Sequence, residues 1–368
     1  MLRILLLAAV SAFAQSGTST IAGTVKDGAG SVIPAAQVTI TNEQTGAVPV
    51  GQKANTTVSF FNPGQISPIS YQFNLGIQRE LRENLLLEAG YIGNVSHHLT
   101  ANDLSLNQVA PQSMVRPFPQ FNNVLWINPS IGNSTYHGVF IRSEKRMARS
   151  LAFLAHYTFS KFLDDVEASQ EFGASGSYMD AYNRRLDKGR SGSDVPHRLV
   201  VTLLYETPKF RGHRLLNTAL GGWKVGVLEN AESGPTFTVI TAANTTNAFP
   251  AGPLRPNLLR NPEISSGQRT IARWFDAGAF ANPPALTFGN SPRSGLRGAP
   301  VVTTDATLEK SLYLKGDRWK FDLRGELYNL LNHAIFNVPG FTLGAADFGV
   351  VSSARSPRAA QLAVRLSF

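Results

Sequence analysis

Four charged residues of alternating sign occupy every second position in a short segment near the end of the chain. They are Lys320, Asp322, Arg324 and Glu326. Charged groups at this spacing can hold a polar solute through ion pairs and charge-assisted hydrogen bonds. They can also pair with charges on neighbouring strands, and cross-strand pairing is the simpler interpretation of this row.

Residue types that bind metal ions are present, but their spacing does not match ligand motifs. The seven histidines include the adjacent His97 and His98, which we place in a loop, and none follows a spacing such as H-x-x-x-H. An acidic segment lacks the Asp-x-Asp-x-Asp-Gly order of a calcium loop. It consists of Asp164, Asp165, Glu167 and Glu171. We interpret this segment as solvated loop charge, and we expect neither a metal site nor a cofactor.

Two glycine–serine motifs come close to the pattern of a nucleophilic serine without completing it. Residues 173–176 read Gly-Ala-Ser-Gly and residues 189–192 read Gly-Arg-Ser-Gly, each one residue short of the G-x-S-x-G elbow. Neither lies between a predicted strand and a predicted helix, which that elbow requires. We therefore expect no catalytic residue and no enzyme.

The charged row belongs to a segment whose alternate positions are apolar, and this pattern predicts a β-strand. Successive side chains of a strand point to opposite faces, so one face is charged and the other apolar. The apolar positions are Trp319, Phe321, Leu323, Gly325 and Leu327. A helix would distribute the four charges around its circumference.

The last eight residues repeat the two-faced pattern. Their polar set includes Arg365, and their apolar set, which we interpret as a C-terminal barrel-assembly signature, is Leu362, Val364, Leu366 and Phe368. In a soluble sandwich, the apolar face of such strands would meet a core and the polar face would meet water. In a membrane barrel, the apolar face meets lipid and the polar face lines a wet lumen. The second interpretation makes lumen-facing candidates of Lys320, Asp322, Arg324, Glu326 and Arg365.

Composition limits the class of protein. The 368 residues are 43% hydrophobic, and no apolar run reaches the roughly 18 residues that a spanning helix needs. Cysteine is absent, which rules out disulfides and thiolate metal sites. The net charge of +9 is spread along the chain without a basic stripe, so we expect no nucleic-acid partner.

The first residues have the layout of a secretory signal. Arg3 precedes an apolar run too short to span a membrane, and Ala12 and Ala14 form an A-x-A cleavage site before Gln15. We expect residues 1–14 to be removed on export. Residues 15–48 form two short β runs around a Gly/Pro turn and resemble the opening third of the carboxypeptidase-regulatory-like domain, a sandwich with a carbohydrate-binding-like fold.

From about residue 53 onward, short and long connections between the predicted strands alternate strictly along the chain. Tight joints are predicted near residues 82–83, 148–149 and 315–317, with a medium connection before Trp223, and four long polar stretches separate the pairs. Bacterial outer-membrane barrels have short periplasmic turns and long extracellular loops, whereas a sandwich does not sort its connections in this way. With a weaker strand at 56–61, the count reaches ten. Tyr71, Tyr91, Tyr157, Trp223 and Trp319 are expected near strand ends.

Several segments of residues 53–368, in one order, resemble the Oar-like branch of the TonB-dependent transporter barrels. They include Tyr71–Glu80, Tyr157–Lys161, Pro196–Leu199, Leu220–Trp223 and Arg324–His333. In that family a plug domain closes a 22-stranded barrel, and a short box couples it to the energy-transducing complex of the inner membrane. Here neither a plug nor a coupling box is identified, and only the last ten or so strands match.

The resulting expectation is an all-β protein: an antiparallel transmembrane β-barrel portion of about ten strands, incomplete or open, with long extracellular loops. The resemblance implies the outer membrane as location, with membrane lipid, the barrel-assembly machinery, the TonB-type complex and an unknown solute as partners. A secreted, soluble, carbohydrate-binding β protein and a non-functional fragment are the alternatives.

Overall fold

The computed structural model describes residues 57–368 except 82–83, 114, 167–177, 211, 213, 243, 247–253 and 315–318. The chain divides into two compact units, residues 1–53 and 54–368, and all described residues belong to the second. The predicted signal peptide with Ala12 and Ala14, the segment 15–48, and the turns at 82–83 and 315–317 lie outside the described residues.

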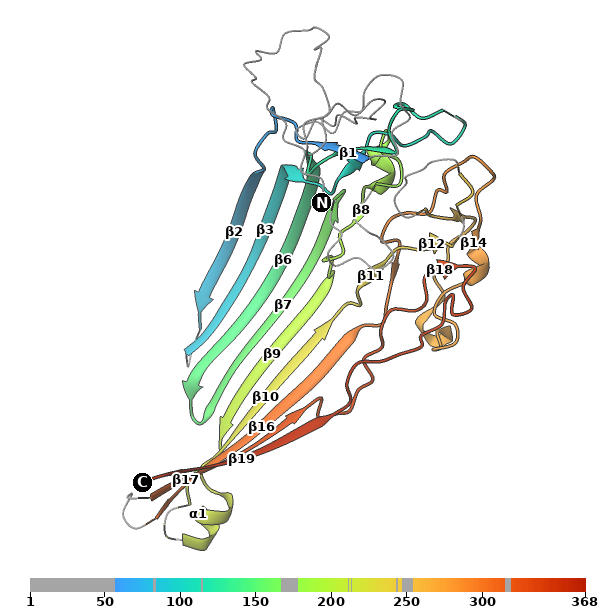
Figure 1. Cartoon of the computed structure of the whole chain (residues 1–368). Helices are drawn as coiled ribbons and strands as arrows, with labels where there is room; N and C mark the ends of the chain where they lie inside the picture. Colours follow the sequence, from blue (N-terminus) through green and yellow to red (C-terminus); the bar gives the residue numbers. More distant parts are fainter. Residues whose placement is uncertain are drawn as a thin grey trace, which may run out of the picture. The chain divides into compact units, whose positions relative to one another are not determined.

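Nine long strands and one two-residue strand form a single antiparallel sheet (Figure 1). The long strands are β2 (Ile69–Glu80), β3 (Leu85–Thr100), β6 (Ser130–Ala148), β7 (Leu151–Asp164), β9 (His197–Glu206), β10 (Trp223–Glu232), β16 (Val301–Leu314), β17 (Trp319–Tyr328) and β19 (Ala359–Ser367). They follow one another in chain order across the sheet, and β8 (Gly189–Arg190) pairs with the end of β7. The predicted all-β, antiparallel sheet of about ten strands is confirmed. The sheet is open, with β2 and β19 at its edges.

The register keeps the two faces of the sheet distinct from strand to strand. Phe321 of β17 lies opposite Leu366 of β19 and Leu312 of β16, whereas the next residue, Asp322, lies opposite Arg365 and Ser311. A slip of one residue would turn every side chain to the other face, so this pattern specifies the pairing. The same alternation extends to β2, where Leu75 and Ile77 are 72% and 75% exposed.

The apolar face of the sheet is not the inside of a core. Leu366 is 44% exposed, and Phe321 and Leu323 are half-buried. The two clusters of buried apolar residues are built mainly from the connections, around Phe237 and around Leu104. An apolar face of this extent exposed on a protein marks contact with a membrane or a partner.

All four long connections leave the same end of the sheet, because consecutive long strands are antiparallel neighbours (Figure 1). These connections are residues 101–129, 165–196, 233–300 and 329–358. The joints between β2 and β3, β6 and β7, β9 and β10, and β16 and β17 are at the opposite end. The predicted alternation is therefore present, and the medium joint contains helix α1 (Arg214–Leu220).

The segment predicted as a tenth barrel strand, residues 56–61, does not join the large sheet. It forms β1 (Thr57–Phe60), which pairs in parallel with β5 (Asn123–Trp126); β4 (Leu104–Ser105) completes this three-stranded sheet. Four residues are too few for a transmembrane strand, which needs about 9–11. The tenth member of the large sheet is instead β8.

Three of the five aromatic residues predicted near strand ends are there, and two are not. Tyr71, Trp223 and Trp319 lie within the first residues of β2, β10 and β17. Tyr91 and Tyr157 lie inside β3 and β7, because both strands continue further than the apolar alternation indicated. Their hydroxyl groups hydrogen-bond to His137 and His197, each at 2.7 Å.

The third and fourth long connections fold together into what we call the loop body, residues 233–300 and 330–357. Its short strands are β11 (Thr236–Phe237), β12 (Ile240–Thr241), β13 (Asn257–Leu258), β14 (Phe280–Ala281), β15 (Leu296–Arg297) and β18 (Thr342–Leu343). In the described parts of the long connections, 3-10 helices lie at Arg184–Asp187, Ser266–Gln268 and Ala277–Ala279. The strand β12 pairs with β18, and Phe275 packs on Phe348, so residues from both connections share one core.

No helix in the described part of the chain combines the length and the apolar character needed to cross a membrane.

Candidate functional site

The predicted lumen-facing residues share one face of the sheet at the β16–β17–β19 end. Asp322 is directly opposite Arg365, and Arg324 is directly opposite Glu309 of β16. The apolar residues Leu362, Val364 and Leu366 of β19 are on the other face, and the ring of Phe368 lies 5.4 Å from that of Trp319. Whether the charged face lines a lumen remains a prediction.

The charges of this row pair with one another. Lys320 contacts Asp322 at 2.9 Å, and the hydroxyl of Ser311 donates to the same carboxylate at 2.5 Å. Arg324 lies between Glu309, at 3.2 Å, and Glu326, at 2.6 Å. All these side chains keep partial solvent exposure, so each pair contributes little to stability. The geometry favours cross-strand pairing over a fixed solute contact for this row.

A hollow with both aromatic and charged walls lies further across the polar face. Tyr136, Phe140 and His156 line it together with Glu88 and Arg142. Arg142 pairs with Glu88 at 3.4 Å and with Glu144 at 2.5 Å, and the Phe140 and His156 rings stack at 5.5 Å. This face therefore presents polar, partly aromatic surface in the middle of the strands.

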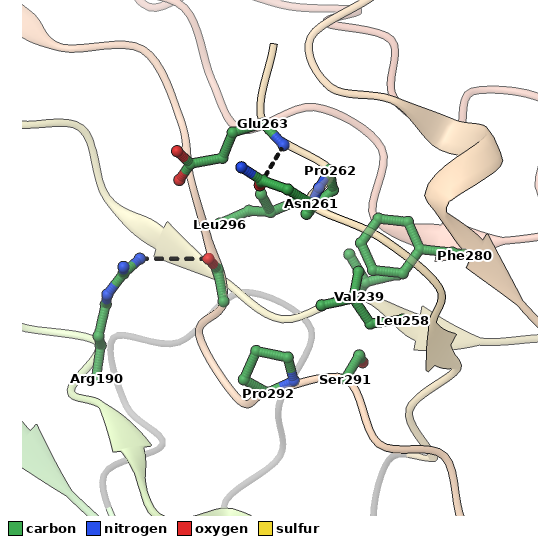
Figure 2. A pocket seen from close by; sticks show the side chains of 11 residues that line it. Arg190, Val239, Leu258, Asn261, Pro262, Glu263, Phe280, Ser291, Pro292 and Leu296 are labelled. Atoms are coloured by element: carbon green, nitrogen blue, oxygen red, sulfur yellow. Dashed lines mark hydrogen bonds between the residues drawn. The ribbon is translucent and has the colours of Figure 1, made fainter.

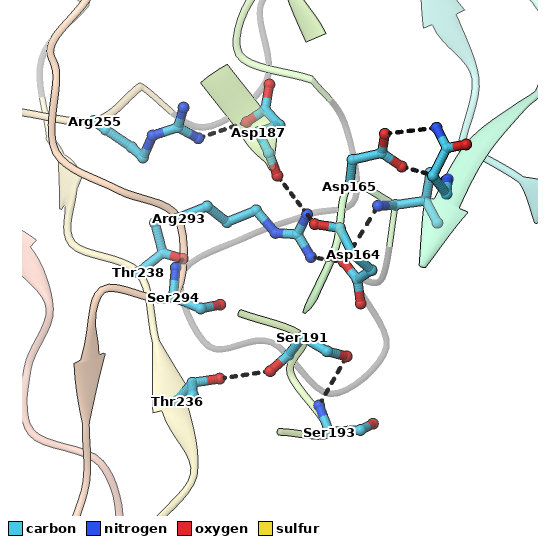
Figure 3. Close-up of polar contacts among 12 residues, drawn as sticks. Asp164, Asp165, Asp187, Ser191, Ser193, Thr236, Thr238, Arg255, Arg293 and Ser294 are labelled. Carbon is cyan, nitrogen blue, oxygen red and sulfur yellow. Dashed lines mark hydrogen bonds and ion pairs between the residues drawn. The ribbon is translucent and has the colours of Figure 1, made fainter. Parts of the chain in front are cut away.

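Three arginines of the loop body reach buried aspartates at the end of β7 and in the connection that follows it. Figure 3 shows two of these arginines, Arg255 and Arg293. Arg255 bonds Asp187 at 2.5 Å, and both side chains are over 90% buried. Arg293 binds Asp164 at the end of β7 and donates to the main-chain oxygen of Asp187 at 2.6 Å. The third pair is Arg297 with Asp194. These pairs fix the connection after β7 against the loop body.

The acidic segment predicted as solvated charge is therefore partly buried structure. Asp164 is 3% exposed and held by Arg293, so its interpretation as solvated was wrong. Asp165 accepts hydrogen bonds from the main-chain and side-chain nitrogens of Asn133. Glu167 and Glu171 lie outside the described residues. Sequence reasoning missed the three ion pairs, because their partners are far apart in the chain.

The histidines do not gather into a ligand set either. His97 and His98 lie in strand β3 rather than in a loop, because β3 runs on to Thr100. His97 pairs with Asn133 at 2.9 Å, and His137 and His197 pair with tyrosines. Within the described residues, no group of three or more His, Asp or Glu side chains is placed to hold a metal ion.

Burial shifts the pKa of several titrating groups in the connections, among them Tyr178 and Arg297. Burial, assisted by the negative charge of Asp165, raises the pKa of Tyr178 to about 12. Burial also lowers the pKa of Arg297, and the neighbouring Asp194 opposes this shift. The phenol of Tyr178 is therefore neutral at neutral pH.

The loop body contains a cavity of about 250 Å³ (Figure 2). Its walls are apolar side chains such as Val239, Leu258 and Phe280, and Arg190, Asn261 and Glu263 add polar groups. None of these residues was singled out by sequence reasoning as a binding residue. The only signal was the concentration of nine of the 21 prolines between residues 233 and 300.

Comparison with protein families identifies this architecture. The outer membrane beta barrel domain family matches residues 6–361. The chain belongs to this family. Membership of the outer membrane beta barrel family places the protein in the cell outer membrane and excludes the alternative of a secreted soluble protein. It also explains the exposed apolar face, since strands of such barrels present that face to lipid.

Solved structures give a distant likeness to this barrel domain. The FrpB iron transporter from Neisseria meningitidis (F3-3 variant) superposes with a TM-score of 0.39 at 12% sequence identity. The match covers 84% of this chain and 33% of the transporter, so the chain spans about a third of that protein's length. No curated protein matches the sequence.

Proposed function

We propose that this barrel domain is part of the wall of a TonB-dependent type of transporter barrel, with its polar face along the solute passage and its long connections recognising solute. The observation that carries the proposal is the two-faced open sheet whose four long connections all leave one end. The resemblance of residues 53–368 to the Oar-like barrels supports the same assignment. Residues 1–14 then act as the export signal, and residues 15–48 as a carboxypeptidase-regulatory-like segment.

Strand parity supports the assignment to a larger barrel. In an antiparallel sheet of nine long strands, the first and ninth strands run in the same direction, so β2 and β19 cannot pair antiparallel with each other. Backbone groups left unpaired in hydrocarbon cost several kcal/mol each, so both edges need partners in the membrane. An odd number of further strands would close the ring with antiparallel pairs throughout.

The edges can be tested by site-specific photo-crosslinking in intact outer membranes. A photoreactive side chain is placed at Gln72 of β2 or Gln361 of β19, both exposed on edge strands, and at Lys224 of the central strand β10 as control. We expect crosslinks to further barrel strands from the two edge positions and none from Lys224. A crosslink joining β2 directly to β19 would show that the nine strands close alone.

Transport itself is tested by uptake of labelled solutes in cells that do or do not produce the protein. Coupling to an inner-membrane energy source predicts that a protonophore abolishes the additional uptake. Uptake that persists without that energy source would exclude coupled transport and leave passive diffusion through the barrel. The barrel-assembly machinery is the expected partner for insertion, recognising Leu362, Val364, Leu366 and Phe368.

A further inference from the structure

The cavity in the loop body has an apolar floor. Phe280 and Leu296 are 8% and 5% exposed and belong to the buried cluster around Phe237, and Val239 and Leu258 lie beside them. Figure 2 shows these side chains and two prolines, Pro262 and Pro292, around the space. Such a mainly apolar hollow with a few convergent polar groups is the usual form of a small-molecule site.

A buried hydroxyl without a partner lines the floor. Ser291 is 3% exposed, and its Oγ has no hydrogen-bond partner among the described residues. The main chain of Ser291 is fixed, since its nitrogen donates to Pro256 and its oxygen accepts from Arg255, both at 3.0 Å. Apart from this hydroxyl, the floor of the cavity is apolar.

Groups of both charge signs surround the cavity. Arg190 donates one hydrogen bond to the main-chain oxygen of Gly295 at 3.2 Å, which holds its guanidinium beside the space. The side-chain oxygen of Asn261 accepts from the main-chain nitrogen of Glu263 at 3.0 Å, so the amide NH2 of Asn261 is the group available to a ligand. The Glu263 side chain is exposed, and no ion pair joins it to Arg190 in the described part of the chain (Figure 2).

The charged groups and the apolar floor of the cavity together fit one type of ligand. An anionic group suits Arg190 and the Asn261 amide, a cationic group suits Glu263, and an apolar body suits the floor formed by Leu258 and Phe280. Because charges of both signs lie beside the cavity, a ligand with a single charge would pair with only one of them. A zwitterion with an apolar side chain satisfies both.

We propose that this cavity binds a free apolar α-amino acid. Its carboxylate pairs with Arg190, its ammonium group pairs with Glu263, and its side chain enters the apolar floor formed by Leu258 and Phe280. This assignment deepens the proposed function and rests on its placing of solute recognition in the long connections. It names the solute class that the loop body accepts.

The test is isothermal titration calorimetry on the full chain purified from outer membranes in detergent. The probes are L-leucine, its amine-free analogue 4-methylpentanoate, its carboxylate-free analogue 3-methylbutylamine, and glycine. We expect saturable binding of L-leucine and binding at least about ten-fold weaker for the other three, because each leaves a charge or the apolar floor unmatched. Equal binding of leucine and 4-methylpentanoate would show an apolar carboxylate site and overturn the proposal.

Variants test whether leucine binds in this cavity or elsewhere on the molecule. Arg190→Gln and Glu263→Gln should each weaken leucine binding at least about ten-fold, and Leu258→Phe should weaken it by filling the floor. Arg355→Gln removes an exposed arginine of the loop body outside the cavity and should leave binding unchanged. Binding that persists in both Arg190→Gln and Glu263→Gln, or no saturable binding by folded wild-type protein, contradicts the assignment.

Uptake and binding measured together show which of the two proposals fails, the amino-acid site or the transporter. Energy-dependent uptake of another solute, with no leucine binding, would leave the transporter assignment and remove only the amino-acid site. Leucine binding to the purified chain, with no additional uptake by producing cells, would retain the site and contradict transport.

Discussion

The side-chain nitrogen of Lys310 lies 2.7 Å from the main-chain oxygen of Gly221 and 3.3 Å from that of Asn217, at the C-terminal end of helix α1. Lys310 is on the apolar face of β16, opposite Trp223 and Leu323, yet it is only 5% exposed. Its ammonium group is also 5.0 Å from the centroid of the Trp223 ring. A cation on an apolar face is tolerated here because carbonyl groups and an aromatic ring replace water.

Replacing Lys310 with methionine should loosen the joint between β9 and β10. Lys310→Met keeps an unbranched apolar side chain but removes the donor to Gly221, and a lost buried hydrogen bond costs about 1–3 kcal/mol. We expect faster proteolysis within residues 207–222, with the rest of the sheet protected. The control is Lys224→Met, an exposed lysine on the polar face of β10. Equal proteolysis rates in the two variants would contradict a fastening role for Lys310.

The buried ion pairs of the connections should contribute far more to stability than an exposed pair in the same body. Arg293→Met leaves the carboxylate of Asp164 buried without its guanidinium, and breaking such a pair costs about 3–5 kcal/mol. Arg260→Met breaks the Arg260–Asp276 pair, whose arginine is 57% exposed, and should cost no more than about 1 kcal/mol. Denaturant unfolding of both variants measures the difference. Similar values would show that the Arg293 pair is not fully desolvated.

Tyr178 gives a pH dependence whose sign follows from its raised pKa. The phenol titrates near 12 in the folded protein and near 10 when exposed, so folding favours the protonated form. The stabilisation is complete below pH 10 and is lost as the pH rises towards 12, by up to about 3 kcal/mol. The ultraviolet difference spectrum between wild type and Tyr178→Phe should titrate with a midpoint near 12. A midpoint near 10 would show that the phenol is accessible to water.

Tyr178→Phe should also be tolerated. The buried Tyr178 hydroxyl has no partner of hydrogen-bond geometry among the described residues, although Arg184 lies close enough to act on its pKa, and the ring packs in the cluster with Ala101 and Leu104. Removing an unpaired buried hydroxyl is neutral or stabilising, in contrast to removing the ring. Thermal unfolding at neutral pH should therefore place Tyr178→Phe at or above wild type, and Tyr178→Ala well below it. A clear loss of stability in Tyr178→Phe would indicate a bonded hydroxyl.

The long strands were predictable because each must present one apolar face and one polar face, which gives its sequence a period of two. The strand β9 (His197–Glu206) has apolar residues at every odd position from Leu199 to Tyr205. Where a strand continues beyond its apolar alternation this signal is lost, so the sequence predicts loop for the part of β3 after Tyr91 and for Leu163 and Asp164 at the end of β7. The short strand at Thr57–Phe60 shows the converse, since alternation over four residues does not specify which sheet a segment joins.

The loop body and its cavity were not predictable from one sequence. Its strands are two residues long, which is too short for any period, and they pair across long separations, as Ile240 does with Thr342. Each arginine of the buried pairs meets an aspartate tens of residues away, at positions set by the folded connections. One sequence on its own does not indicate which of its many charged side chains are buried in the folded protein.

The assignment of the two faces, on which the transporter proposal depends, can be tested because the chain has no cysteine. Arg324→Cys and Leu323→Cys introduce single thiols at adjacent positions of β17, on the polar and the apolar face. In outer-membrane vesicles, a charged, water-soluble thiol reagent should label Arg324→Cys and spare Leu323→Cys. After solubilisation and unfolding, both should react equally, which controls for expression and thiol chemistry. Labelling of Leu323→Cys in intact vesicles, with Arg324→Cys protected, would reverse the faces and remove the polar row from any aqueous passage.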